Sequence, residues 1–569
     1  MPLPAAPLLL LAVAGMALIL GRWVSTSRWY EGIWLAAMLG SAGLMISGEF
    51  PLEAGADSSA TWSADPLAVA GQSLALVFGL LFGIGSFGIH SVDDRTAERF
   101  GYLSCLIAGV MLVGASGDLV TMALSVEIVQ FAAWSLRRLD RREKAAQSSR
   151  SHLQDRDPRG VSAGGGDGPV VWSGIAASVC LWLGIALLAN LAGSTQFNEI
   201  RQVLADAYVP GVGRAVIGAG SKLGLLAIGL IVGGLASRMG LVPWQLGFIE
   251  GTRHGGYWTT GCVLLGSQLV GVLGLARLCG TVWVGYREEV LVLLLVVAAA
   301  TCAVSGSLAA LGLMNGEGRL RRWTASLPML HGAWLTIGLI ASTADLAIPE
   351  HSLSAAGGQP GALALLIFAA GAGLLGLAGL FLLLSYLAHD DRDVEFVDEL
   401  TGLGRLRPVP AAALMILLGN LIGQPPLGGF WAHWLMMVAG LNVRAAGTRE
   451  NAVPHSGLIL LVIMAAAATL ITACVAIRFA RIVLLEQPIA QSLPRGRRAA
   501  LVMGCGCALL LVAVGLFPAR VLNVLSEVRG QQTRSGSDSP SGSSRGDATA
   551  TRSWQERLPV RPMVDAPRT

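Results

Sequence analysis

Long apolar segments recur along most of the chain, and they restrict its fold more than any other feature. An apolar window of about 20 residues is long enough to cross the hydrocarbon core of a bilayer as one helix. We expect about 14 membrane spans, near residues 4–21, 29–48, 66–90, 100–116, 117–137, 172–194, 217–243, 256–279, 288–313, 323–345, 360–388, 409–440, 456–484 and 499–521. Only 13% of the 569 residues are charged, against about 25% in a soluble globular protein. Because a helix satisfies its own backbone polar groups in lipid, the sequence predicts an all-α polytopic membrane protein.

Two of these spans contain residues that end helices. The twelfth span is too long for one straight crossing, and the segment GQPPLGG at 423–429 should break it at mid-depth. The seventh span ends in Gly240 and Pro243, which predicts a similar break. Helices interrupted at corresponding places in two halves of a membrane chain are typical of inverted repeats with a transport site between them.

Charged loops indicate the orientation in the membrane. The segment RRLDRREKAAQSSR after the fifth span is rich in arginine, which is typical of a cytoplasmic loop. The basic cluster at 319–322 and the basic run at 494–498 fall on the same side by parity. The apolar run at 8–20 has no basic residue before it and no clear cleavage site, so we expect a retained first span. Both termini are therefore predicted on the outer side of a bacterial inner (plasma) membrane.

Several ionisable groups lie inside the predicted spans, where their burial is costly unless they face other helices or a wet cavity. Glu127 either makes a structural hydrogen bond between helices or acts as a proton-binding or field-setting group. Lys222 and Arg238 lie about 24 Å apart along one helix, so they are at opposite ends of the seventh span. Lys222 either snorkels to the membrane surface or joins the path. Arg238 cannot lose its proton, so we expect a fixed positive charge that pairs with Glu127 or Glu250.

Three further polar side chains complete the candidate path. Gln268 lies at the middle of the eighth span, and His331, in the tenth, is either a satisfied core residue or part of the site. His433 directly follows the predicted break in the twelfth span. Imidazole titrates near neutral pH and can both donate and accept a proton, so His433 is the best single candidate for proton transfer. The predicted proton-translocating residues are Glu127, Lys222, Arg238, Gln268, His331 and His433.

Several motifs of cofactor and metal sites are absent from the sequence. It contains no CxxC pair and no HExxH zinc motif. We therefore expect this chain to bind no cofactor and no metal, and to carry no catalytic residue. The net charge of +4 is too small to indicate a nucleic-acid partner.

The polar positions also fall within ordered motifs. These are Asp118-Leu119 with Glu127, SRMGLVPWQ (237–245), Glu250, Ser267-Gln268, RRWTASLPMLHGAW with His331, GLGRLRP (402–408), and GNLIGQPPLGGFWAH, which ends at His433. In these motifs the chain resembles the N subunit of the proton-pumping NADH:quinone oxidoreductase (complex I). That subunit belongs to a family of antiporter-like membrane subunits that includes multisubunit sodium/proton antiporters. The resemblance extends from about Arg99 to Leu441.

The resemblance implies a fold and a function. It implies antiporter-like inverted repeats with broken helices 7 and 12, in a subunit that moves protons while partner subunits transfer electrons. NADH, flavin, iron–sulfur clusters and quinone are expected in those partners, which are other membrane subunits of a complex I-like or antiporter assembly. The implied organisation is an N-terminal helical part (1–98), a proton-translocating core (99–442, with a polar loop at 138–171), C-terminal helices (443–528) and a disordered polar tail (529–569).

The chain departs from the family where the chemistry is concentrated. The three positions of the family's lysines hold Arg238, Gln268 and His433, and the histidine of its VPFH motif is replaced by Gln245. Arginine keeps the charge but removes proton exchange, glutamine removes both, and histidine keeps a titratable site. We therefore expect weakened or rerouted proton conduction. Two alternatives are a subunit of a multisubunit cation/proton antiporter or related complex, and a divergent structural subunit that does not conduct.

Overall fold

The computed structural model describes residues 5–20, 27–46, 62–63, 65–87, 95–151, 168–206, 219–283, 287–314, 320–346, 361–388, 394–443, 455–488 and 498–525. Within these residues the regular elements are helices, joined by turns and short connections, with isolated bridges such as Trp62–Ser116 and Asp118–Gln196. The predicted disordered tail and residues 152–167 of the predicted polar loop lie outside the described residues. The chain divides into one unit of residues Met1–Ser526 and a second of Glu527–Thr569, and only the first contains described residues.

Helices lie at all fourteen predicted positions. The described helices, including short ones outside the predicted spans, are α1 (Ala5–Leu20), α2 (Ser27–Ile46), α3 (Pro66–Gly85), α4 (Thr96–Ala115), α5 (Leu119–Ser151), α6 (Gly168–Ala192), α7 (Phe197–Asp206), α8 (Ala219–Arg238), α9 (Gln245–His254), α10 (Tyr257–Thr281), α11 (Arg287–Met314), α12 (Leu320–Leu346), α14 (Ala362–Tyr386), η2 (Val397–Leu400), α15 (Leu403–Leu406), α16 (Pro408–Leu421), α17 (Gly428–Asn442), α18 (Ser456–Leu484) and α19 (Arg498–Leu516). Ten of the described helices are long and apolar enough to cross a membrane. The predicted all-α membrane fold is confirmed.

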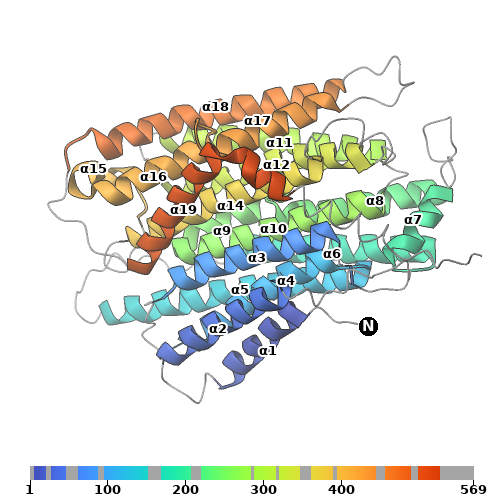
Figure 1. Ribbon diagram of the computed structural model, residues 1–569, viewed down its shortest axis with the longest axis horizontal. Coiled ribbons are helices and arrows are strands. Elements are labelled where there is room, and N and C mark those ends of the chain that lie inside the picture. The colour runs from blue at the N-terminus through green and yellow to red at the C-terminus, as the bar shows by residue number, and fades with distance from the viewer. Residues whose placement is uncertain are drawn as a thin grey trace, which may run out of the picture. The chain divides into compact units, whose positions relative to one another are not determined.

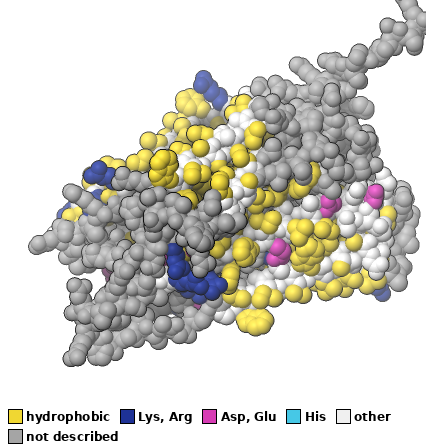
Figure 2. All heavy atoms as spheres, turned by 90° about the horizontal axis from the view of Figure 1, so that it is seen from below, with side chains coloured by type: hydrophobic (Ala, Val, Ile, Leu, Met, Phe, Trp, Pro, Cys, Tyr) yellow, Lys and Arg dark blue, Asp and Glu magenta, His cyan; other side chains and the backbone are white. Residues whose placement is uncertain are grey.

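Helix α10 lies at the centre of the described bundle. It contacts α3, α4, α5, α8, α12 and α14, and the central apolar window of α10 is 100% buried. The long helices of residues 1–526 run side by side around it (Figure 1). Helix α6 is peripheral, with only 28% of its window buried. On the face drawn in Figure 2, hydrophobic side chains cover much of the described surface and charged ones are few, as expected of a surface that faces lipid.

The two predicted helix breaks are confirmed, and they are built alike. Helix α8 ends at Arg238 and α9 begins at Gln245, while α16 ends at Leu421 and α17 begins at Gly428. In each break a glycine, Gly240 or Gly423, adopts a φ of 73° and precedes a proline by three residues. This left-handed conformation carries no steric penalty for glycine, so both spans can turn within the bundle.

Side chains satisfy backbone groups that the breaks leave open. Asn420 accepts a hydrogen bond from the Gly429 N–H at 2.6 Å and donates to the Ala372 carbonyl of α14 at 3.1 Å. A Cβ atom at Gly429 would overlap the backbone oxygen of Asn420, so α16 and α17 meet without spare room. At the other break, the Val242 N–H donates to the Thr301 hydroxyl of α11 at 3.0 Å. The breaks are therefore fixed by neighbouring helices.

Helix α5 continues beyond residue 137, the predicted end of its span, to Ser151. This extension carries two acids in ordered contacts. Asp140 accepts a hydrogen bond from the Gly256 N–H at the start of α10 at 2.7 Å, and both oxygens of Glu143 accept from Arg99 at 2.8 Å. Arg321 donates to the carbonyls of residues 252 and 255 beside the same helix start. The basic segments of α5 and α12 therefore lie at one end of the bundle, as the orientation argument requires.

Candidate functional site

The break at the end of α8 carries an acid–base pair. Arg238 is the last residue of α8 and is 5% exposed, and its Nη2 lies 3.9 Å from Oε1 of Glu127 on α5. Of the two acids considered as partners, Glu127 forms the ion pair. That Glu127 oxygen is buried and makes no hydrogen bond with the part of the chain that is described. It is therefore available to a proton or a water.

Two neutral groups hold the guanidinium of Arg238 more closely than Glu127 does. Nη1 donates a very short hydrogen bond to the Gln130 side-chain oxygen, and Nη2 donates to the Ser178 hydroxyl of α6 at 2.8 Å. Gln130 lies three residues after Glu127 and so shares its face of α5. The arrangement fixes a positive charge beside a carboxylate without a close bidentate pair.

Lys222 is not part of this cluster. It lies in the first turn of α8, is exposed, and stands about 24 Å from Arg238 along the helix. This position fits the snorkelling alternative of the sequence analysis.

Gln268 lies buried on α10, where its amide N–H donates to the Pro328 carbonyl of α12 at 2.8 Å. A Cβ atom at Gly332 would lie 2.9 Å from the Met239 carbonyl and 3.2 Å from Nε2 of Gln268. Helices α10 and α12 and the α8 break therefore meet in close contact at this level.

The two candidate histidines line one cavity. His331 on α12 and His433 on α17 both line a cavity of about 20 Å³, together with Asn420 and Trp334. The rings of Trp334 and His433 are stacked with centroids 4.7 Å apart. Neither imidazole makes a hydrogen bond with another described residue, and the cavity is large enough for one water. The arrangement can place a water between two titratable rings.

The candidate residues therefore form two clusters. Arg238 lines a different cavity, of about 70 Å³, and Gln268 lines neither cavity. The structure brings Glu127 together with Arg238, and His331 with His433. It places Gln268 between the two clusters, bonded to α12.

Several residues of these clusters escape the sequence argument. Gln130 could have been found from its helical spacing to Glu127, and Asn420 from its position just before the GQPP break. Ser178 gives no signal, because it lies in an otherwise apolar span.

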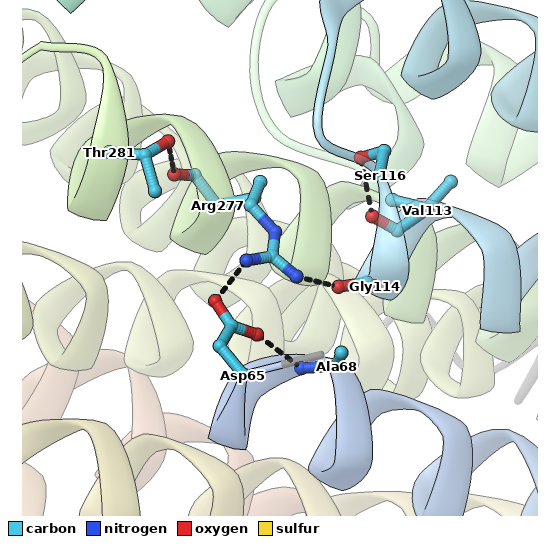
Figure 3. Close-up of polar contacts among 7 residues, drawn as sticks. All are labelled: Asp65, Ala68, Val113, Gly114, Ser116, Arg277 and Thr281. Atoms are coloured by element: carbon cyan, nitrogen blue, oxygen red, sulfur yellow. Dashed lines mark hydrogen bonds and ion pairs between the residues drawn. The ribbon is translucent and has the colours of Figure 1, made fainter. Parts of the chain in front are cut away.

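Arg277 forms a third polar cluster that sequence reasoning missed (Figure 3). Its guanidinium donates to the Asp65 carboxylate and to the Gly114 carbonyl, at the C-terminal end of α4. The other carboxylate oxygen of Asp65 accepts from the Ala68 N–H at 2.9 Å and so caps α3. Arg277 is 1% exposed and ties α3, α4 and α10 together.

Comparison with known proteins shows which protein family this architecture resembles. The transmembrane family of NADH:quinone oxidoreductase and Mrp antiporter subunits matches residues 170–446, which include both broken helices. These residues match the family of antiporter-like membrane subunits. The predicted family resemblance is thereby confirmed.

Relatives and solved structures agree with the antiporter-like assignment. The chain is 25% identical over 491 residues to NADH-quinone oxidoreductase subunit N of Erythrobacter litoralis, covering 85% of this chain and 88% of that protein. It is 26% identical over 422 residues to the subunit N of an Anaeromyxobacter species, covering 71% and 72%. A chain of respiratory complex I from Thermus thermophilus has the same fold, with a TM-score of 0.66 at 17% identity over 92% of this chain and 99% of that one. A chain of the Mrp complex from Dietzia also matches, with a TM-score of 0.66 at 16% identity over 92% and 51%.

Proposed function

We propose that this chain is a proton-translocating membrane subunit of an NADH:quinone oxidoreductase-like complex. Electron transfer in partner subunits would drive proton movement through its buried Glu, Arg and His groups. The observation that carries the proposal is the placement of one polar cluster at each broken helix: Glu127 with Arg238, and His331 with His433.

The chemistry of each side chain determines its role in the proposed proton movement. Arg238 cannot release its proton, so it sets the local field, whereas the Glu127 carboxylate can take up a proton at its unbonded oxygen. Approach or withdrawal of a charge on a neighbouring subunit would change the strength of the Glu127–Arg238 pair. His331 and His433 can pass a proton to each other through one water in their cavity.

The remaining parts of the proposal concern the assembly. We infer that NADH, flavin, iron–sulfur clusters and quinone are held by other subunits, in a bacterial inner membrane with both termini of this chain outside. Support comes from the relatives named subunit N and from structural matches that are chains of multisubunit membrane complexes.

A second candidate is a subunit of a multisubunit cation/proton antiporter, which the likeness to the Dietzia Mrp complex favours. A third candidate is a structural subunit that does not conduct protons. The hydrogen bond from the Gln268 amide to the Pro328 carbonyl supports it. Purification of the chain from native membranes separates the first two, since redox subunits would accompany the one and antiporter subunits the other.

The test of conduction is His433→Ala in the assembled complex, reconstituted in liposomes. Loss of a group that transfers protons should lower the proton flux by at least about tenfold. His455→Ala is the matched control, because His455 precedes α18 and lines neither cavity. An unchanged flux in the His433 variant would favour the structural subunit.

A further inference from the structure

We propose that the cavity between α5, α6, α9 and α10 binds an oxyanion of the phosphate class. This site is separate from the histidine cavity, and its ligand has the opposite charge to the proton of the proposed function.

The cavity has a volume and lining residues that suit a small anion. Its volume is about 70 Å³, room for several waters or one tetrahedral oxyanion, since a single water needs about 10–15 Å³. Its lining residues include Arg137 and Gln130 of α5, Ser173 of α6, Arg238 of α8 and Ser267 of α10. Trp134 also lines it and is 41% exposed, so the cavity reaches the surface of the bundle there.

Arg137 has no counter-charge within the part of the chain that the structure describes. Its buried Nε makes no hydrogen bond, and no acid among the described residues forms an ion pair with it. The two acids that follow it on α5 are engaged elsewhere, Asp140 with the Gly256 N–H and Glu143 with Arg99. Arg137 is half-buried, so its uncompensated charge carries part of the cost of burial, and an anion would offset that cost.

The other polar groups at the cavity also favour an anion. The side-chain oxygen of Gln130 accepts a hydrogen bond from Arg238, so the amide nitrogen of Gln130 faces Gly174. A Cβ atom added at Gly174 would lie 2.6 Å from this nitrogen. Ser267 is 8% exposed and its hydroxyl donates to no other described residue. Guanidinium, amide and hydroxyl donors suit a phosphate-like oxyanion, whereas a cation would meet two positive charges.

Two sources could supply this chemistry: free inorganic phosphate, or the headgroup phosphate of an anionic lipid that enters beside Trp134. The first arm measures the Tm of the full-length protein in detergent, in sodium phosphate and in sodium gluconate of equal ionic strength. The second arm uses native mass spectrometry after purification in phosphatidylglycerol or in phosphatidylcholine.

For a free anion, phosphate should raise Tm by about 2 °C or more at saturation, and Arg137→Gln should abolish the rise. For a lipid, phosphatidylglycerol but not phosphatidylcholine should remain bound, and Arg137→Gln should release it. Arg142→Gln is the control, because this neighbouring arginine is exposed and lies outside the cavity.

Ser267→Ala is the substitute test variant if the Arg137 variant does not fold. It should weaken the phosphate or lipid response several-fold while the protein remains assembled. The proposal is overturned if neither arm gives a response in the unmodified protein. It is also overturned if the Arg142 variant loses the response as fully as the Arg137 variant, or if neither Arg137→Gln nor Ser267→Ala reduces it.

Discussion

Replacing Arg238 by lysine introduces the residue that the family resemblance implies there, and it tests whether this chain needs a fixed charge at that position. The guanidinium spans two acceptors on different helices, Gln130 on α5 and Ser178 on α6, and it also faces Glu127 at 3.9 Å. A lysine ammonium is a single nitrogen on a flexible stem, so it can keep the attraction to Glu127 but not both hydrogen bonds.

The magnitude follows from that lost bond. An interhelical hydrogen bond in a membrane protein contributes about 0.6–1.7 kcal/mol, so the loss of one such bond in Arg238→Lys should lower the free energy of unfolding by the same amount. Arg238→Gln should cost more, because it also leaves Glu127 without its cation. Unfolding of each variant by sodium dodecyl sulfate in mixed micelles measures both values.

The same substitution has an opposite effect on conduction. A lysine can exchange protons with Glu127, so we expect a higher proton flux in the reconstituted complex than with arginine. A lysine variant that is as stable as the unmodified chain would refute the role of the Gln130 and Ser178 bonds. A flux that does not rise would refute the idea that Arg238 limits proton exchange at this cluster.

Two further substitutions test the framework of the site, each by the same unfolding measurement. Gly429→Ala places a methyl group against the Asn420 backbone oxygen and should cost about 1–3 kcal/mol, whereas Gly506→Ala on α19, which has nothing within 4 Å, should not destabilise. Arg277→Gln should cost about 1–3 kcal/mol, below a fully buried pair because the Asp65 side chain is 37% exposed. An Arg277 variant of unchanged stability would mean that water already satisfies Asp65 and the end of α4.

The fold could be predicted because its causes are local. Apolar windows of membrane length set the helices, and the glycines and prolines near 240 and 423 set the two breaks without reference to the rest of the chain. The far end of α5 was harder to predict. Its residues 138–151 are polar and resemble a loop, but Asp140 and Glu143 contact other helices there.

The site depends on contacts between distant segments, which composition and spacing do not encode. The sequence left Glu127 and Glu250 as equal partners for Arg238, and only packing against α5 decides between them. Arg277 and Asp65 are 212 residues apart, and neither position suggests the other. Motif similarity marked Arg238, Gln268 and His433, but it could not show that Arg238 and His433 line different cavities and that Gln268 lines neither.

The hydrogen bond of the Gln268 amide explains why the two clusters do not form one continuous row of proton carriers. Its amide nitrogen is bonded to the Pro328 carbonyl, and the surrounding part of α10 is buried on all sides. A glutamine side chain holds no exchangeable charge, so it does not carry a proton between the clusters as a lysine would.

Coupling between the clusters can instead pass through the backbone. Arg238 is followed by Met239, whose carbonyl lies against Gly332, and Gly332 is the residue after His331. This contact leaves no room even for a methyl group, so a shift of the Arg238 backbone would press on the segment of α12 that carries His331. Protonation of Glu127 weakens its attraction for Arg238 and so permits that shift. We therefore expect a change of charge at one broken helix to reach the histidine cavity at the other through this contact, without a proton passing Gln268.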